Sequence, residues 1–203
     1  WGSLAIDRAA ARARLGVAPE ESVLLFLARL APFKGTRQLL RILPRLLAES
    51  RRPLRVLIAG SGEDEAWMRR RAAGLVEAER VRFLGPVPHE EVPPLFAAAD
   101  CFLSLNTYSN MAVPTCEAMV MGCPVVATDV AGTRETVVDG ENGRLVPPGQ
   151  GVPDRGLGRL PYRRGKVEHY IGAGALAEQY RKARGAAAAV PVREIADRAR
   201  RGD

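Results

Sequence analysis

Apolar runs without alternation are the feature of this 203-residue chain that most constrains its fold. The first run covers residues 23–28 and is followed by a helical segment at about 36–49. Strands buried on both faces have such runs, whereas strands with one solvated face alternate apolar and polar residues. The repeated β-α order predicts an α/β fold with a doubly wound parallel sheet, which binds ligands at the carboxyl ends of its strands.

The remaining elements continue this order. We expect further strands at 55–59, 81–84, 101–105 and 125–128, and helices at about 63–76, 90–98 and 112–121. A short helix closed by turn residues is expected within 132–143, and an amphipathic helix at 5–15 that is either a linker or a lid.

One domain accounts for most of the chain, because 203 residues suffice for a single core of ordinary size. Residues 1–21 form a linker with an N-terminal helix, and residues 22–148 form the ligand-binding domain. Residues 149–172, rich in Gly, Pro and Arg, are expected to be an inserted irregular loop, and 173–203 to contain C-terminal helices. Since the chain opens on Trp1 rather than Met, we expect a fragment of a longer protein.

The composition excludes several classes of protein. A net charge of +7 is compatible with nucleic acid, an anionic membrane surface or an acidic small ligand as partner. With only 5% aromatic residues, a stacking platform for single-stranded nucleic acid is disfavoured. Three cysteines without metal-ligand spacing indicate reduced thiols in a cytoplasmic protein and no metal site. No apolar run reaches the roughly 18 to 20 residues of a membrane span, and no signal peptide is visible.

The first candidate site follows the first strand. Arg29 and Lys34 flank a turn at Pro32, and a helix begins just after Gly35. A diphosphate placed there would meet free backbone amides, the helix dipole and two cations. Without other evidence, two solvated cations are an equally good interpretation.

Glycines mark two further turns. Gly60 and Gly62 follow the second strand, where a Gly-x-Gly is commonly only a tight turn, although it places a backbone loop on the ligand side. Gly140 and Gly143 are expected to have positive φ. Glu135, in the same segment, is compatible with a plain surface position.

Glu117 is the most informative carboxylate, because it lies within an apolar helical segment. A buried, ionised carboxylate costs several kcal/mol unless it is paired or hydrogen-bonded. A ribose diol would offer two hydroxyl donors to one carboxylate. The alternative is that Glu117 caps a neighbouring backbone or pairs with an Arg. His89 and His169 are isolated in sequence, and a capping or surface role is favoured for His89.

Together these segments resemble the group 1 family of retaining glycosyltransferases, also called glycosyltransferase family 4. The resemblance covers residues 22–148. The matching segments are Arg29 with Lys34-Gly35, residues 57–62, residues 81–85, residues 117–128 around Glu117-Ala118-Met119, and Glu135 with Asp139-Gly140 and Asn142-Gly143. The family has the GT-B fold, in which two Rossmann-like domains face each other, so the resemblance implies that this chain is one half of that architecture.

The resemblance also implies residue roles. Arg29 and Lys34 would neutralise the donor diphosphate and are the catalytic candidates, acting through electrostatic stabilisation of the leaving group. Glu117 would hold the ribose. Backbone near Gly85 and Val87 would meet the nucleobase, and backbone near Val113 and Pro114 the phosphate or sugar. The full set of expected donor-binding residues is Arg29, Lys34, Gly60, Gly62, Gly85, Val87, Ser109, Asn110, Val113, Pro114 and Glu117.

One departure from the family concerns the sugar end of the site. The family carries a Glu eight positions before the second Glu, and here that position is Ser109. Ser109 or Asn110 can hydrogen-bond a sugar hydroxyl but supplies no carboxylate. The sequence therefore leaves two hypotheses open: a hexosyltransferase module using a UDP- or GDP-linked donor, or a degenerate nucleotide-binding or scaffold domain without turnover.

The resemblance implies partners as well. We expect a nucleotide-sugar donor and a separate N-terminal acceptor-binding domain, no cofactor, no metal and no nucleic acid. We expect a cytoplasmic location, with peripheral contact to the inner face of the membrane as an open alternative. By itself, residues 1–203 should bind nucleotide weakly and transfer no sugar.

Overall fold

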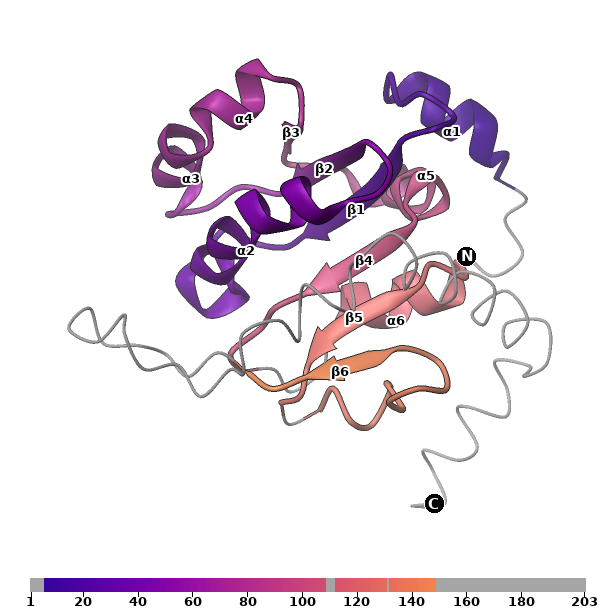
Figure 1. Cartoon of the computed structure of the whole chain (residues 1–203). Coiled ribbons are helices and arrows are strands. Elements are labelled where there is room, and N and C mark those ends of the chain that lie inside the picture. Colours follow the sequence, from indigo (N-terminus) through magenta and orange to yellow (C-terminus); the bar gives the residue numbers. More distant parts are fainter. Residues whose placement is uncertain (1–5, 109–111, 131, 149–203) are drawn as a thin grey trace.

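The computed structural model describes residues 6–108, 112–130 and 132–148. Within these ranges, six strands form one sheet (Figure 1). The strands are β1 (Ser22–Leu27), β2 (Leu54–Ala59), β3 (Val81–Gly85), β4 (Cys101–Ser104), β5 (Val125–Thr128) and β6 (Arg144–Val146). The inserted loop predicted at 149–172 and the helices predicted at 173–203 lie outside the described residues.

The sheet has the strand order β3-β2-β1-β4-β5-β6, and every neighbouring pair is parallel. The chain winds outward from β1 through β2 to β3, then returns to place β4 on the other side of β1 and winds outward again. This reversal between β1 and β4 is a topological switch point, where a ligand crevice opens at the carboxyl ends of the strands. The predicted doubly wound, Rossmann-like sheet is confirmed.

Helices cover both faces of the sheet, with α2, α3 and α4 on one face and α5 and α6 on the other (Figure 1). The helices are α1 (Arg8–Arg14), α2 (Thr36–Glu49), α3 (Glu65–Arg71), α4 (Ala73–Glu77), α5 (Val92–Ala98) and α6 (Val113–Val120), with short 3₁₀ turns η1 (Pro32–Lys34) and η2 (His89–Glu91). Among the described residues, no helix is both long and apolar enough to cross a membrane.

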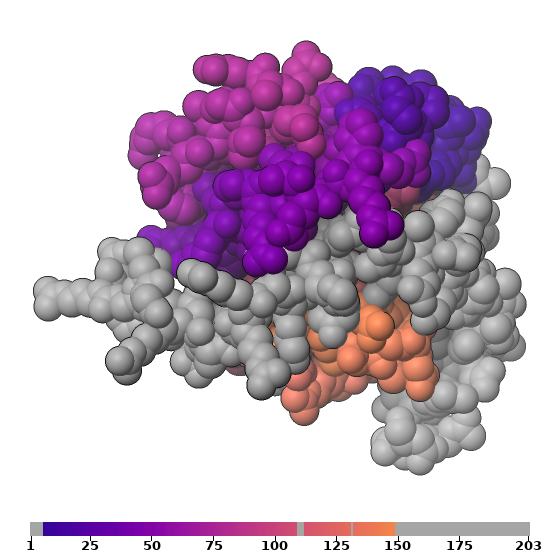
Figure 2. Space-filling view, viewed as in Figure 1, coloured from indigo at the N-terminus to yellow at the C-terminus, as the bar shows by residue number. Residues whose placement is uncertain are grey.

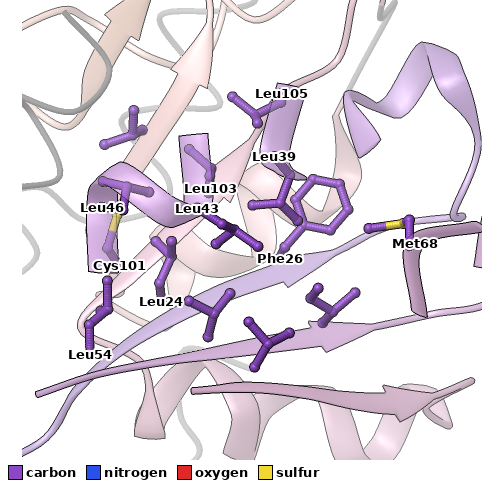
Figure 3. Close-up of a cluster of buried hydrophobic side chains, with 14 of the residues drawn as sticks. Leu24, Phe26, Leu39, Leu43, Leu46, Leu54, Met68, Cys101, Leu103 and Leu105 are labelled. Carbon is purple, nitrogen blue, oxygen red and sulfur yellow. The ribbon is translucent and has the colours of Figure 1, made fainter. Parts of the chain in front are cut away.

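Alternate side chains of β1 enter two different cores. Leu24 and Phe26 pack with Leu43 of α2 in one cluster (Figure 3), and Leu25 packs with Phe96 of α5 in the other. The violet and magenta side chains of α2 and α3 form the outer surface over the first face (Figure 2). Successive strand residues point to opposite faces of the sheet, and helices cover both faces. Both sets of β1 side chains therefore have an apolar environment, which explains the unbroken apolar run from which the sheet was predicted.

The segment at 63–76 forms two helices rather than the one predicted. α3 ends at Arg71 and α4 begins at Ala73, because Ala72 between them has φ −98° and ψ 7°, away from α-helical values. Gly74, the weakest helix former of the segment, lies just after this break. The helix predicted at 90–98 likewise begins as the 3₁₀ turn η2 before α5.

The segment at 132–143 forms hydrogen-bonded turns, so the short helix predicted there is wrong. The Asn142 carboxamide oxygen accepts from the Val138 amide at 2.7 Å, and the Asp139 carboxylate accepts from the Leu145 amide at 2.9 Å. Asn and Asp side chains that bind the local backbone in this way compete with helix formation. They lead the chain into β6, which the sequence analysis missed.

The two glycines of this segment have different roles. Gly140 has the predicted positive φ, at 84°, whereas Gly143 does not. At Gly143 a Cβ atom would lie 2.8 Å from the Val137 side chain. The requirement there is close packing, not backbone conformation.

The N-terminal helix α1 packs against α5 near the amino ends of the strands. Arg8 and Arg12 pair with Asp100 at 2.6 and 3.3 Å, and Arg8 donates to the carbonyl oxygen of Ala97 in the last turn of α5 at 2.9 Å. Asp100 directly precedes β4, so this cluster lies at the edge opposite the switch-point crevice. Of the two interpretations of this helix, the lid is therefore wrong.

Gly35 brings the beginning of α2 against the end of β4. Its φ is 82°, and a Cβ atom on it would lie 2.2 Å from the carbonyl oxygen of Leu105, the residue after β4. Only glycine both tolerates this conformation and allows this approach. The contact spans the switch point and fixes the loop after β1 beside the segment after β4.

Replacing Gly35→Ala should lower the free energy of unfolding by about 2–5 kcal/mol, from a left-handed backbone penalty of about 1–2 kcal/mol and overpacking of about 1–3 kcal/mol. Urea denaturation measures the loss. Gly122→Ala is the matched control, because Gly122 has a φ of 68° but open space around its Cβ position, so only the backbone penalty applies. Equal losses in the two variants would contradict a packing role for Gly35.

Candidate functional site

The carboxyl edge at the switch point is built by two segments that hydrogen-bond to each other. The Thr107 amide donates to the Phe33 carbonyl oxygen at 2.9 Å, and the Thr107 hydroxyl donates to the same oxygen at 3.3 Å. Thr107 follows β4, and Phe33 lies in η1 after β1. Together with the approach of Gly35 to Leu105, these bonds hold the candidate phosphate loop in place.

The two predicted cations lie between β1 and α2, with Lys34 at the end of η1 just before the start of α2. The Arg29 side chain is 66% exposed, with its guanidinium 3.6 Å from the Glu63 carboxylate, and such an exposed pair contributes little to stability. Lys34 is half-buried, with its Nζ 5.3 Å from the centroid of the Phe33 ring. No side chain caps the N-terminus of α2. Two cations and an uncapped helix start therefore meet at one edge, an arrangement that favours an anion.

Gly60 and Gly62 let the loops after β1 and β2 run against each other. A Cβ atom on Gly60 would lie 1.9 Å from the carbonyl oxygen of Ala28, and one on Gly62 would lie 2.4 Å from that of Leu30. The Leu30 amide donates to the Ser61 carbonyl oxygen at 2.9 Å. These contacts explain both glycines by packing, and their contact with a ligand stays a prediction.

A buried hydrogen bond that the sequence analysis missed links the same two loops. The Thr36 hydroxyl, in the first turn of α2, donates to the Asp64 carboxylate, and both side chains are buried. The Asp64 amide in turn donates to the Leu30 carbonyl oxygen at 2.9 Å. The sequence did contain one indication of this contact: Thr36 and Asp64 both lie where the segments that follow adjacent strands join the next helix, and these segments meet at one edge of the sheet.

The loop after β3 crosses the carboxyl edge to the opposite face of the sheet. Gly85 ends β3 with a φ of 72°, and its carbonyl oxygen accepts from the Gly60 amide at 2.7 Å. Val87 is partly buried against the cluster that contains α5 and α6. The loop then enters η2 at His89, close to α6. Contact of Gly85 and Val87 with a base stays a prediction.

Glu117 lies in α6 with its side chain only 17% exposed. Burial raises the pKa of its carboxyl group above the usual range, and the nearby His89 acts in the opposite direction. The Nδ1 atom of His89 is 3.8 Å from the Glu117 carboxylate, and the His89 side chain is 70% exposed. Within the described residues the carboxylate thus faces an imidazole and no Arg, and sequence reasoning missed this pairing.

The start of α6 offers fewer backbone donors than expected. Pro114, in the first turn, carries no amide hydrogen, and the amides of Thr115 and Cys116 both bond to the Ala112 carbonyl oxygen, at 2.8 and 3.3 Å. Val113 is 52% exposed at this edge. Any ligand contact by Val113 or Pro114 stays a prediction, and Ser109 and Asn110 lie outside the described residues.

Glu135 is exposed, in the turns before β6. Within 6–108, 112–130 and 132–148, no cluster of three or more His, Cys, Asp or Glu side chains has the geometry to hold a metal ion. His169 lies outside the described residues.

The order of the strands and the cations at their switch point define a class: a Rossmann-like α/β domain whose ligand edge favours an anion. This chain belongs to the glycosyl transferases of group 1, whose family model matches residues 21–154, more than half of its length. The resemblance seen in the sequence is confirmed.

A curated relative, the D-inositol 3-phosphate glycosyltransferase of Nocardia farcinica, is 40% identical over 147 residues, or 69% of this chain. The match covers only 32% of that relative. The chain thus spans about a third of the length of the curated relatives it matches.

Solved structures agree with this assignment. The structure of Anabaena Alr3699/HepE in complex with UDP-glucose has a TM-score of 0.70 at 25% identity, covering 98% of this chain and 53% of that one. The C-terminal domain of a group 1 family protein, LpcC of Francisella tularensis, has a TM-score of 0.67 at 19% identity. That comparison covers 88% of this chain and 90% of that domain, and it supports the fold alone.

Thr36→Val should lower the free energy of unfolding by about 1–3 kcal/mol, because it leaves the buried Asp64 carboxylate without its hydroxyl donor. Chemical denaturation at neutral pH measures the loss. Thr136→Val is the control, since the half-buried Thr136 hydroxyl donates only to the Thr133 carbonyl oxygen, at 3.1 Å, and should cost about 1 kcal/mol or less. An equal loss of unfolding free energy in the two variants would show that the Thr36–Asp64 hydrogen bond contributes no more than an ordinary one.

The three cysteines should differ in reactivity. Burial raises the pKa of Cys101 to about 12 and that of Cys123 well above its ordinary value. Cys116 is only partly buried, and burial raises its pKa too. Because the thiolate is the reactive form, iodoacetamide should modify Cys116 first, and faster as pH rises. Peptide mapping by mass spectrometry measures the order in which the cysteines are modified. Modification of Cys101 before Cys116 would contradict the prediction.

Proposed function

We propose that this chain is the donor-binding half of a retaining glycosyltransferase that uses a nucleoside diphosphate hexose. The observation that carries the proposal is that Arg29, Lys34 and Glu117 gather at one edge of the sheet, two cations beside the start of α2 and a half-buried carboxylate on α6. This edge lies at the switch point, the usual ligand position of such sheets. Membership in the group 1 glycosyl transferases supports the reaction class.

The diphosphate would lie at the start of α2. Arg29 and Lys34 would each form a charge-assisted hydrogen bond, contributing about 1.5–3 kcal/mol, and the helix N-terminus would add about 0.3–1 kcal/mol. Association itself costs about 4–15 kcal/mol. Phosphate contacts alone therefore cannot hold a donor, and the ribose and base must contribute.

Glu117 would accept hydrogen bonds from the ribose hydroxyls. A carboxylate removed from water gains most from donors that the ligand brings. The base would lie toward Gly85 and Val87, in the loop that leads to His89. UDP is the first candidate nucleotide, since Alr3699/HepE binds UDP-glucose; GDP is the second.

In the transfer step, Arg29 and Lys34 would stabilise the charge that develops on the departing diphosphate. Such preorganised cations act on the transition state without reorganisation. We assign to the reaction retention of configuration through an oxocarbenium-like state on one face of the sugar. We assign acceptor binding to a partner domain, because this chain spans only about a third of the length of its curated relatives. A cytoplasmic location and peripheral membrane contact stay predictions.

A second function is favoured by Ser109, which stands where the family has a Glu for the sugar hydroxyls. The domain would then bind nucleotide without turnover and act as a scaffold. Assays of sugar transfer with the donor half joined to its partner domain separate the two functions. A persistently inactive joined protein that still binds nucleotide favours the scaffold.

Isothermal titration calorimetry with UDP, GDP and ADP tests the site. Glu117→Gln should weaken binding of the preferred nucleotide by about 10–100-fold, because charge-assisted hydrogen bonds to the ribose are lost. Glu77→Gln, a change at an exposed residue of α4, should have no effect. The loss should shrink with the 2′-deoxy nucleotide, which lacks one of the donors. Absence of binding to all three nucleotides, or equal binding by the Glu117→Gln protein, would refute the proposal.

A further inference from the structure

We propose that His89 is a positioning residue for Glu117. The His89 imidazole holds the Glu117 carboxylate at the carboxyl edge, where the incoming ribose hydroxyls also bind it. The proposal rests on the nucleotide site proposed above. It adds a residue that the sequence analysis set aside as a surface or capping histidine.

Backbone geometry fixes His89 beside α6. The Glu91 amide donates to the Pro88 carbonyl oxygen at 3.0 Å, which shapes the turn that presents the imidazole. η2 continues directly into α5, which packs on α6, and the far end of α5 is anchored through Arg8 and the Asp100 cluster. The His89 backbone therefore has a defined position relative to Glu117.

The contact lies at the boundary between protein and solvent. Nδ1 of His89 and Oε1 of Glu117 are 3.8 Å apart, beyond a direct hydrogen bond but close enough for charge attraction. The His89 side chain is 70% exposed and that of Glu117 is 17% exposed, so the imidazole lies on the solvent side of this pair. A carboxylate has two acceptor oxygens, so ribose hydroxyls can bind Glu117 while the imidazole stays beside Oε1.

The charges around the imidazole are mostly negative. On its own turn lie Glu90 and Glu91, and Glu91 is paired with Arg14 of α1 at 3.0 Å. From α6 come Glu117 and the neighbouring Cys116 thiol. The loop before His89 and the residues of α5 carry no charged side chain. Glu117 and the acidic residues of this turn attract a positively charged side chain at position 89.

The arrangement makes the role of His89 depend on pH. Burial raises the pKa of Glu117, so acidification tends to protonate it and remove its capacity to accept ribose hydroxyls. A positive charge on the His89 side chain lowers the pKa of Glu117 and so opposes that protonation. His89 should therefore matter most on the acid side, where protonation of Glu117 competes with ribose binding, and little at about pH 8, where the Glu117 carboxyl group is ionised with or without His89.

The test compares wild type, His89→Gln, Glu117→Gln and the double variant by calorimetry with UDP, or with whichever nucleotide binds best. His89→Gln should weaken binding by about 3–10-fold near pH 5.5 and by less than about twofold near pH 8, a coupling of ordinary size for neighbouring charges. In the Glu117→Gln background the same change should have no effect. His89→Lys, a permanent cation, should restore binding at the acid pH.

A measurement without nucleotide separates this proposal from the proposed function. Carbon-detected NMR of the Glu117 carboxyl group should show its titration midpoint moving upward in His89→Gln, with thermal unfolding unchanged. A midpoint that stays in place, or a His89→Gln loss that is equal at both pH values and persists in the Glu117→Gln background, would overturn the positioning role. Nucleotide binding that needs Glu117 but not His89 would refute this inference alone. An NMR shift without nucleotide binding would refute the nucleotide site.

Discussion

The approach of Gly35 to the Leu105 carbonyl oxygen is the contact on which the rest of the structure depends. It joins the chain after β1 to the chain after β4, the two strands from which the halves of the sheet wind outward. The bonds from Thr107 to the Phe33 carbonyl oxygen complete this junction. The ligand edge is thus built by backbone packing, and the cations Arg29 and Lys34 are carried on a frame that does not depend on them.

The second half of the edge is positioned from the opposite end of the sheet. Arg8 and Arg12 hold α5 through Asp100, near the amino ends of the strands. The C-terminal end of α5 is anchored there, near the amino edge of the sheet. Its N-terminal end continues from η2, which carries His89 beside Glu117. A cluster remote from the ligand edge therefore contributes to the geometry of that edge through a rigid helix.

Much of the fold followed from local patterns. The helix at 36–49 and the strand at 125–128 have their predicted bounds, and the other predicted strands differ by a residue or two at an end. Errors arose where side chains bind the local backbone, as Asn142 does before β6, or where a helix breaks at Ala72. The residue types at Arg29, Lys34 and Glu117 indicated their chemistry, but the Thr36–Asp64 bond and the contact of His89 with Glu117 join segments 28 residues apart.

The sequence by itself determined the class of sheet, the approximate positions of its main helices and the presence of two cations after the first strand. These properties depend on short-range periodicity, which burial imposes on each element separately. Tertiary structure alone decided which polar groups meet: that Glu117 faces His89, and that Asp64 accepts from the Thr36 hydroxyl. Those pairings depend on where the crossover after β3 and the junction at the switch point place distant segments, and no local pattern contains that information.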